Sequence, residues 1–326
     1  MTIFELSALI KLMISIPLIS ICIPAYKNVK YLKRLLESIS IQTFSDFEVI
    51  ITDDSNDNSV SDYIYNKTWN FQLSYFKNEK PLGSPENWNS AVNQSKGEWI
   101  KIMHHDDWFS SKSSLEVFVQ QIRKHENYTF FFSAYQNIYE VEKTEKAIQG
   151  KSLIRKSILK NPAALLASNI IGPPSVTIYK NDKNMFYDKR LQWLVDVDFY
   201  VRYLQNSKPL YISKPLINIG IHDEQVTNYS FSKPEIEIPE HLVVLNKTGE
   251  ECLRNIMVYD AFWRLVRNLR IRSVEEFSKY NKEEVNIPGK LKQIINRQRK
   301  LPSWFLFFGP FSKVTMLFSY LFNTRN

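Results

Sequence analysis

The segment Pro17-Leu-Ile-Ser-Ile-Cys-Ile23 is a continuous run of mostly apolar, β-branched residues. Such a run, without polar alternation, is typical of a strand buried on both faces of a sheet. The segments Phe47-Glu-Val-Ile-Ile-Thr52 and Trp99-Ile-Lys-Ile-Met103 predict two further strands. Between the strands, apolar residues recur at helical spacing, first at Leu32, Leu35, Leu36 and Ile39. Strands that alternate with amphipathic helices predict an α/β fold, with a mostly parallel sheet flanked by helices.

Polar residues follow three of the predicted strands at the point where each strand ends. These groups are Tyr26-Lys27-Asn28, Asp53-Asp54-Ser55 and His105-Asp106-Asp107. Ligands on parallel sheets bind beyond the carboxyl ends of the strands. We therefore expect the three groups to lie along one edge of the sheet and to form a ligand site.

The second half of the chain is less regular, and from about Pro234 its pattern becomes helical. For the 326 residues we predict an N-terminal extension over residues 1–16, a catalytic domain over 17–232 and a helical C-terminal region over 233–326. Residues 1–12 precede the first strand, and we expect their removal to leave folding and activity intact.

The formal net charge of +8 indicates either an anionic partner or a solvated basic surface. Two cysteines, Cys22 and Cys252, argue against a disulfide scaffold and fit a reducing compartment. The chain has 8 glycines and none between Pro24 and Tyr31, which argues against the glycine-rich loops of dinucleotide and P-loop sites. No nucleic-acid-binding motif is present, so we expect no nucleic-acid partner.

The pair Asp106-Asp107 is the sharpest chemical signal. Carboxylate oxygens are preferred ligands of Mg²⁺ and Mn²⁺, and such an ion stabilises a departing diphosphate. Aspartates also cap helices, so the pair alone supports metal binding and capping equally.

Three other positions carry both a chemical and a structural interpretation. Asp54 suits a hydrogen bond to a base or a ribose, or a place in a polar turn. Asp196 and Asp198 stand just before a predicted helix, where one can serve as a general base while the other caps or pairs elsewhere. His222 suits a metal or a phosphate, although a lone histidine is more often structural.

The C-terminal segment combines basic and aromatic residues. Lys290 to Lys300 is basic, and Trp304-Phe-Leu-Phe-Phe308 and Leu317-Phe-Ser-Tyr-Leu-Phe322 follow it. Gly309, Pro310 and Lys313 interrupt the apolar run and argue against a spanning helix. Two interpretations remain, an interfacial anchor on an anionic membrane and a helical hairpin packed on the catalytic domain.

In this order, the segments resemble the family 2 glycosyltransferases, which have the GT-A fold. The matching segments are residues 19–28, 48–57, 83–89, 97–99, 105–107, 194–202 and 219–222. Each motif is weak, but their ordered combination over roughly residues 17–230 is specific.

The resemblance implies a role for each matching residue. Pro24, Ala25, Tyr26, Asn28, Gly83 and Asn89 belong to the donor-nucleotide pocket, and Asp54 contacts the base. Asp106 and Asp107 take the ribose and metal positions of the Asp-x-Asp motif, and His222 reaches the metal or the diphosphate. Asp196 is the catalytic base of an inverting transfer, with Mn²⁺ or Mg²⁺ as the cofactor.

Three residues depart from the family pattern. His104 stands where the fullest motif has an acid, Ser55 follows Asp54 where a glycine is usual, and Trp88 replaces a basic residue.

The function expected from these observations is transfer of a sugar from a nucleotide-sugar donor to a saccharide or lipid-linked acceptor. The resemblance suggests bacterial surface-polysaccharide synthesis, in the cytoplasm at the inner face of the cell membrane. The alternatives are another nucleotide-handling α/β enzyme, such as a nucleotidyltransferase, and a non-catalytic module that binds anionic ligands.

Overall fold

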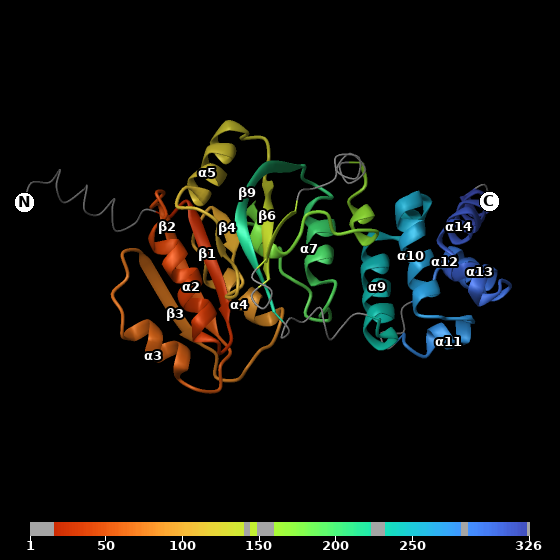
Figure 1. The fold of residues 1–326 in the computed structure, drawn as a ribbon, viewed down its shortest axis with the longest axis horizontal. Coiled ribbons are helices and arrows are strands. Elements are labelled where there is room, and N and C mark those ends of the chain that lie inside the picture. The colour runs from red at the N-terminus through yellow and green to blue at the C-terminus, as the bar shows by residue number, and fades with distance from the viewer. Residues whose placement is uncertain (1–15, 140–143, 149–159, 223–231, 282–285, 325–326) are drawn as a thin grey trace, which may run out of the picture. The chain divides into compact units, whose positions relative to one another are not determined.

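The computed structural model describes residues 16–139, 144–148, 160–222, 232–281 and 286–324 (Figure 1). The chain forms two compact units. The sheet unit comprises the described parts of Met1–Gln149, Pro173–Phe186 and Lys208–Ile221, and the helical unit those of Gly150–Gly172, Tyr187–Ser207 and His222–Asn326. The predicted domain of residues 17–232 draws on both units, so its boundaries stay a prediction. The segment 1–12 lies outside the described residues.

One sheet organises the first unit, and its strands in the described residues follow the order β3-β2-β1-β4-β8-β6-β9-β5, with β7 paired to β6. The strands are β1 (Ile19–Ala25), β2 (Phe47–Asp53), β3 (Gln72–Lys77), β4 (Trp99–Ile102), β5 (Trp108–Phe109), β6 (Phe130–Tyr139), β7 (Thr144–Ile148), β8 (Thr177–Lys180) and β9 (Pro209–Ile221). From β3 to β4 the pairing is parallel. Beyond β4 it is mixed, because β8 runs antiparallel to both β4 and β6.

Burial explains why the sequences of the central strands are continuous apolar runs. Every residue of β1 and β2 is buried. The helices that alternate with the strands are α2 (Val29–Ser40), α3 (Ser59–Tyr65), α4 (Glu86–Gln94) and α5 (Ser114–Lys124). Helix α2 buries Leu32, Leu35, Leu36 and Ile39, which are the residues predicted to face the core. Helix α4 packs on β1 and β2. The α/β fold is confirmed.

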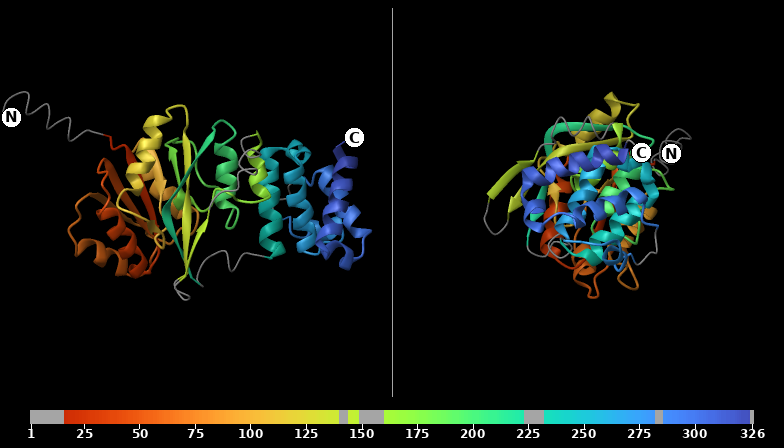
Figure 2. Two further views of the ribbon diagram at one scale, coloured as in Figure 1. Left: turned by 45° about the horizontal axis from the view of Figure 1, so that its top comes forward. Right: turned by 90° about the vertical axis from the view of Figure 1, so that its right-hand side faces the viewer.

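The second unit is helical, as predicted for the C-terminal part. Its elements are η1 (Pro162–Leu166), α7 (Val195–Tyr203), α9 (Pro234–Thr248), η3 (Glu250–Arg254), α10 (Ile256–Asn268), α11 (Val274–Ser278), α12 (Gly289–Arg299), α13 (Ser303–Phe307) and α14 (Gly309–Thr324). Helix α10 packs against η1, η3, α12 and α14 (Figure 2, η1 yellow-green and the others cyan to blue). It buries Tyr259, Phe262 and Trp263. Within the described residues, no helix has the length and apolar character needed to cross a bilayer.

Helix α7 corrects one detail of the sequence interpretation. It begins at Val195, so Asp196 and Asp198 lie in its first turn and not before it. Val197 between them and Phe199, Tyr200 and Val201 after them are buried, and helix α7 therefore lies in the core of its unit.

Candidate functional site

The polar groups that follow β1, β2 and β4 lie at one edge of the sheet, as predicted. In the parallel register Ala25 pairs with Asp53, and Cys22 pairs with Ile102. Asn87 of α4 joins two of the strand ends, because its Nδ2 donates to the carbonyl oxygens of Ala25 (3.3 Å) and Thr52 (3.1 Å). This edge therefore has a fixed backbone geometry before any ligand binds.

The turn after β1 holds the predicted nucleotide residues. Pro24 and Ala25 are buried, Asn28 is half-buried and Tyr26 is 47% exposed. Lys27 (φ 51°) and Asn28 (φ 40°) adopt left-handed backbone conformations, which asparagine tolerates better than most residues. The Lys27 amide donates to Ser55 Oγ at 2.6 Å. The serine that replaces the usual glycine thus ties the second strand end to this turn.

Asp54 is buried and organises the loop that leads to α4. Its Oδ1 accepts from the amide of Leu82 (3.0 Å) and from Asn78 Nδ2 (2.6 Å), and its Oδ2 accepts from the amide of Gly83 (2.8 Å). Gly83 has φ of 75°, a conformation that favours glycine. A carboxylate has about four acceptor positions, so one remains on Oδ2 for a ligand N–H.

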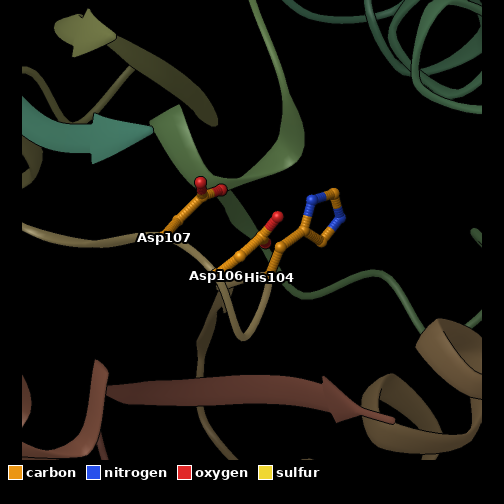
Figure 3. A group of neighbouring side chains, drawn as sticks. All are labelled: His104, Asp106 and Asp107. Carbon is orange, nitrogen blue, oxygen red and sulfur yellow. The ribbon is translucent and has the colours of Figure 1, made fainter. Parts of the chain in front are cut away.

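A potential metal-binding group lies after β4. His104, Asp106 and Asp107 each offer one ligand atom, and these atoms lie within 4.8 Å of one another. Figure 3 shows the three side chains on the same side of the loop. Two carboxylates and an imidazole suit Mn²⁺ well and Mg²⁺ less well, because imidazole is a borderline ligand. His104, which stands where the fullest family motif has an acid, thus offers an imidazole nitrogen in place of a carboxylate oxygen.

Three contacts from elsewhere in the sheet unit hold this loop. Ser175 Oγ accepts from the His104 amide (2.9 Å), and the Gly220 amide donates to Asp107 Oδ1 (3.3 Å). Arg34 of α2 donates from Nη2 to the carbonyl oxygen of Asp106 (2.8 Å). The Arg34 guanidinium also lies 3.6 Å from the centre of the Trp108 ring. These contacts limit how far the two carboxylates can move apart.

Burial sets the charges around the group. It raises the pKa of Asp107 well above its usual range, and the nearby charge of Asp106 adds to that shift. It lowers the pKa of His104 to about 4, so the imidazole is neutral at pH 7, as metal ligation requires. Lys101 is fully buried in β4, and burial lowers its pKa to about 7. Its Nζ donates to the carbonyl oxygen of Ser175.

Trp88 and His104, two residues that depart from the family pattern, are in contact. The Trp88 ring lies with its centroid 4.6 Å from that of the His104 ring, at 47°. Asn89, the neighbouring predicted nucleotide residue, is half-buried on α4.

The Asp196 carboxylate accepts two hydrogen bonds within the helical unit. Asn169 Nδ2 donates to its Oδ2 at 2.7 Å, and the Val197 amide donates to its Oδ1 at 2.8 Å. Burial raises the pKa of Asp196 to about 6. A carboxylate with that pKa accepts protons efficiently near neutral pH.

Asp198 is paired with basic side chains, as predicted for one of the two aspartates. Its buried carboxylate forms ion pairs with Arg202 (2.8 Å) and Lys247 (2.6 Å). Glu240 of α9 secures the start of the same helix. Its carboxylate accepts from the amides of Gln192 (2.8 Å), Trp193 (3.0 Å) and Leu194 (2.7 Å). Helix α7 is thus held at its start and at Asp198.

His222 is half-buried and directly follows β9, where the helical unit resumes. Among the described residues, the group of possible metal ligands after β4 consists of His104, Asp106 and Asp107. The role of His222 at a metal or a diphosphate therefore stays a prediction. Sequence patterns did not indicate Arg34, Asn87 or Glu240. Lys101 carried a signal, since a single lysine interrupts a four-residue strand that is otherwise apolar.

Comparisons with known proteins identify the family of this chain. The profile of glycosyl transferase family 2 matches residues 20–187. An uncharacterized glycosyltransferase of Haemophilus influenzae is 30% identical over 219 residues, which cover 64% of this chain and 70% of that protein. A hyaluronan synthase of Pasteurella multocida is 25% identical over 288 residues, 88% of this chain but 28% of that protein.

Solved structures show the same fold. The structure of Staphylococcus aureus TarS 1–349 in complex with UDP-GlcNAc has a TM-score of 0.61 at 16% identity, over 94% of this chain and 90% of that one. The mannosyltransferase PcManGT from Pyrobaculum calidifontis, in complex with GDP-Man and Mn²⁺, has a TM-score of 0.55 at 10% identity, over 95% and 88%. Since the family profile spans more than half of the sequence, the chain belongs to glycosyltransferase family 2 and is a glycosyltransferase with a GT-A type fold.

Proposed function

We propose that this enzyme transfers a sugar from a nucleotide-sugar donor to a hydroxyl group of a saccharide or lipid-linked acceptor, with inversion at the anomeric carbon. The observation that carries the proposal is the group of His104, Asp106 and Asp107 at the carboxyl ends of parallel strands. The structures of TarS with UDP-GlcNAc and of PcManGT with GDP-Man each contain a nucleotide sugar, which supports this donor class.

In the proposed mechanism, Asp196 is the general base. Its carboxylate takes the proton of the acceptor hydroxyl, whose oxygen then bonds to the anomeric carbon. The bond from that carbon to the nucleoside diphosphate breaks in the same displacement, and the diphosphate leaves with the electron pair. Asn169 orients the carboxylate, and the raised pKa of about 6 makes Asp196 a stronger base than an exposed aspartate.

Asp107 and Asp106, with His104 now added, would hold the divalent metal ion, Mn²⁺ or Mg²⁺. When bound, such an ion supplies positive charge that stabilises the departing diphosphate. His222 stays a proposed further contact of the metal or diphosphate. The proposed nucleotide pocket is formed by Pro24, Ala25, Tyr26, Asn28, Asp54, Gly83, Asn89 and Asp106. Asp54 uses its remaining acceptor position for the base while it holds the 78–83 loop.

We place the enzyme in the cytoplasm at the inner face of the membrane, in surface-polysaccharide synthesis. The similarity to a hyaluronan synthase supports a saccharide product, and the basic, aromatic C-terminal segment supports an anionic membrane surface as a partner.

A panel of nucleotide sugars, with Mn²⁺ or with EDTA, tests the reaction. We expect turnover of one donor class that EDTA abolishes.

Asp196→Asn should abolish transfer yet keep donor binding. Wild-type kcat/KM should decrease below about pH 6 as Asp196 is protonated. The exposed Asp62→Asn is the control. Near-normal turnover by Asp196→Asn would exclude the base role, and turnover of nucleoside triphosphates alone would favour a nucleotidyltransferase. Nucleotide binding without turnover of any donor would favour the binding module.

A further inference from the structure

Three polar residues of helix α14 lie on the side that packs onto α10. Ser312, Ser319 and Asn323 are buried. Trp263 of α10 donates from Nε1 to Ser312 Oγ at 3.1 Å. The Tyr259 hydroxyl, also on α10, bonds with Ser319 Oγ at 2.6 Å and accepts from Asn323 Nδ2 at 2.7 Å. The spacing of seven and then four residues places these three side chains on one face of the helix.

The opposite side of α13 and α14 is apolar and exposed. We call it the apolar face, and it comprises Trp304, Phe307, Phe308, Phe311, Val314, Leu317, Phe318, Leu321 and Phe322. Trp304 is 69% exposed and Phe322 is 62% exposed. A surface helix of a water-soluble domain shows the reverse arrangement, with its apolar stripe toward the core. A contiguous apolar surface of this kind marks an interaction site.

Cations lie at both ends of this face. The Arg270 guanidinium is 5.5 Å from the centre of the Phe307 ring, and that of Arg297 is 5.5 Å from the centre of the Phe322 ring. The sequence from Gly289 to Thr324 contains no Asp or Glu. It does contain six basic residues, namely Lys290, Lys292, Arg297, Arg299, Lys300 and Lys313. The partner of the apolar face must therefore accept aromatic side chains and carry negative charge.

We propose that the apolar face docks on a bilayer of anionic phospholipids. Helices α13 and α14 lie in the plane of the interface, with the aromatic side chains at the level of the acyl chains and the cations at the phosphates. With 16 residues, α14 is about 24 Å long, shorter than the roughly 30 Å hydrocarbon core. A second copy docked face to face would bring two sets of the cations that flank the face, Arg270 and Arg297, together, so electrostatic repulsion opposes that occupant.

This inference rests on the proposed membrane location and not on the role of Asp196. It sharpens that location by naming the side of the protein that meets the lipid. The hydrogen bonds from α10 explain how the orientation is fixed, because turning α14 over would leave Tyr259 and Trp263 without these partners.

Flotation of the full chain with phosphatidylcholine vesicles, with and without phosphatidylglycerol, tests the proposal. We expect binding to the anionic vesicles only, weakened by salt. The double variant Phe318→Ser/Phe322→Ser should lose this binding. Its control is Ile41→Ser/Tyr65→Ser, which alters two exposed apolar residues of the sheet unit and should bind normally.

A second pair of variants tests the charge. Arg299→Gln/Lys300→Gln should weaken binding to anionic vesicles by roughly fivefold for each cation removed. Lys67→Gln/Lys124→Gln, which removes two exposed cations of the sheet unit, should leave it unchanged.

The proposal is overturned if the wild-type chain stays unbound on anionic vesicles at low salt, or if the Phe318/Phe322 variant binds as well as the wild type. A dimer of the free protein that dissociates in that variant would assign the face to a second copy. Turnover of the active nucleotide sugar, measured without vesicles, is a separate readout. Loss of turnover with vesicle binding intact counts against the proposed reaction and leaves the docking face in place.

Discussion

The Trp88 indole and the His104 imidazole pack against each other with centroids 4.6 Å apart, next to the carboxylates of Asp106 and Asp107. Both residues depart from the pattern that this chain otherwise shares with its family. Their contact places an aromatic ring against a neutral imidazole, where the family pattern has a basic residue and an acid.

A double-mutant cycle tests this coupling. His104→Asp alone adds a carboxylate beside two others, and Trp88→Lys alone sets an ammonium against the imidazole, so each should lower thermal stability. The double variant can form an ion pair and should recover part of the lost stability, with a coupling free energy of about 0.5–3 kcal/mol. Thermal unfolding of the metal-free protein supplies the measurement. The control cycle uses His105→Asp, and additive effects in the first cycle would contradict the coupling.

Gly220 tests how tightly β9 holds the loop that carries Asp106 and Asp107. A Cβ at this position would lie 2.7 Å from the carbonyl oxygen of Asp106 and 3.0 Å from Arg34 Nη2. Gly220→Ala should therefore displace the loop and lower kcat/KM by roughly 100-fold, the usual effect of a misplacement of about 1 Å. Mn²⁺ affinity should fall with it. Gly289→Ala is the matched control, because a Cβ there has no heavy atom within 4 Å. Equal activity of the two variants would show that the loop accommodates the methyl group.

Lys101 predicts a pH dependence of stability. Burial lowers its pKa from 10.5 to about 7, so between pH 7 and 10.5 the unfolded chain binds more protons at this residue than the folded chain. This contribution to the free energy of unfolding therefore increases as the pH rises, by about 1.4 kcal/mol per pH unit at most. Urea unfolding at pH 7 and pH 9 should show this increase in the wild type relative to Lys101→Met.

The same comparison with Lys96→Met, at an exposed lysine, should show no such difference. Parallel pH profiles for the wild type and Lys101→Met would mean that the Lys101 ammonium stays charged in the folded protein.

Glu240 should act on Asp196 through the start of α7. Its carboxylate accepts from three amides there, and its charge contributes to the raised pKa of Asp196. In Glu240→Gln one oxygen is replaced by a donor, and the negative charge is lost. We expect the acidic limb of kcat/KM to move below about pH 6, and stability to fall by about 1–3 kcal/mol.

Glu237→Gln, one turn earlier on α9, is the control, since Glu237 bonds to the amide of Ser232. A loss of stability without any movement of the pH limb would restrict Glu240 to a structural role.

The sequence alone predicted the strands whose signal is local. The runs at Pro17–Ile23 and Phe47–Thr52 are apolar because both faces of β1 and β2 are covered, and this requirement appears in every residue of the run. The pair Asp106-Asp107 was also evident, because a strand end is a local feature and parallel strands bring such ends together. The mixed pairing of β8 and the length of β9 were not evident, because partner choice depends on distant segments.

Only the tertiary structure decided which residues support the site. Arg34 and Gly220 reach the loop of Asp106 and Asp107 from 72 and 113 residues away, and Glu240 reaches Leu194 across 46 residues. The sequence of α14 likewise cannot tell which face of the helix a neighbour covers. The hydrogen bonds from α10 settled that question in favour of the polar face. Local patterns record what a residue tolerates, whereas its partners are set by chain packing, which lies beyond any window of sequence.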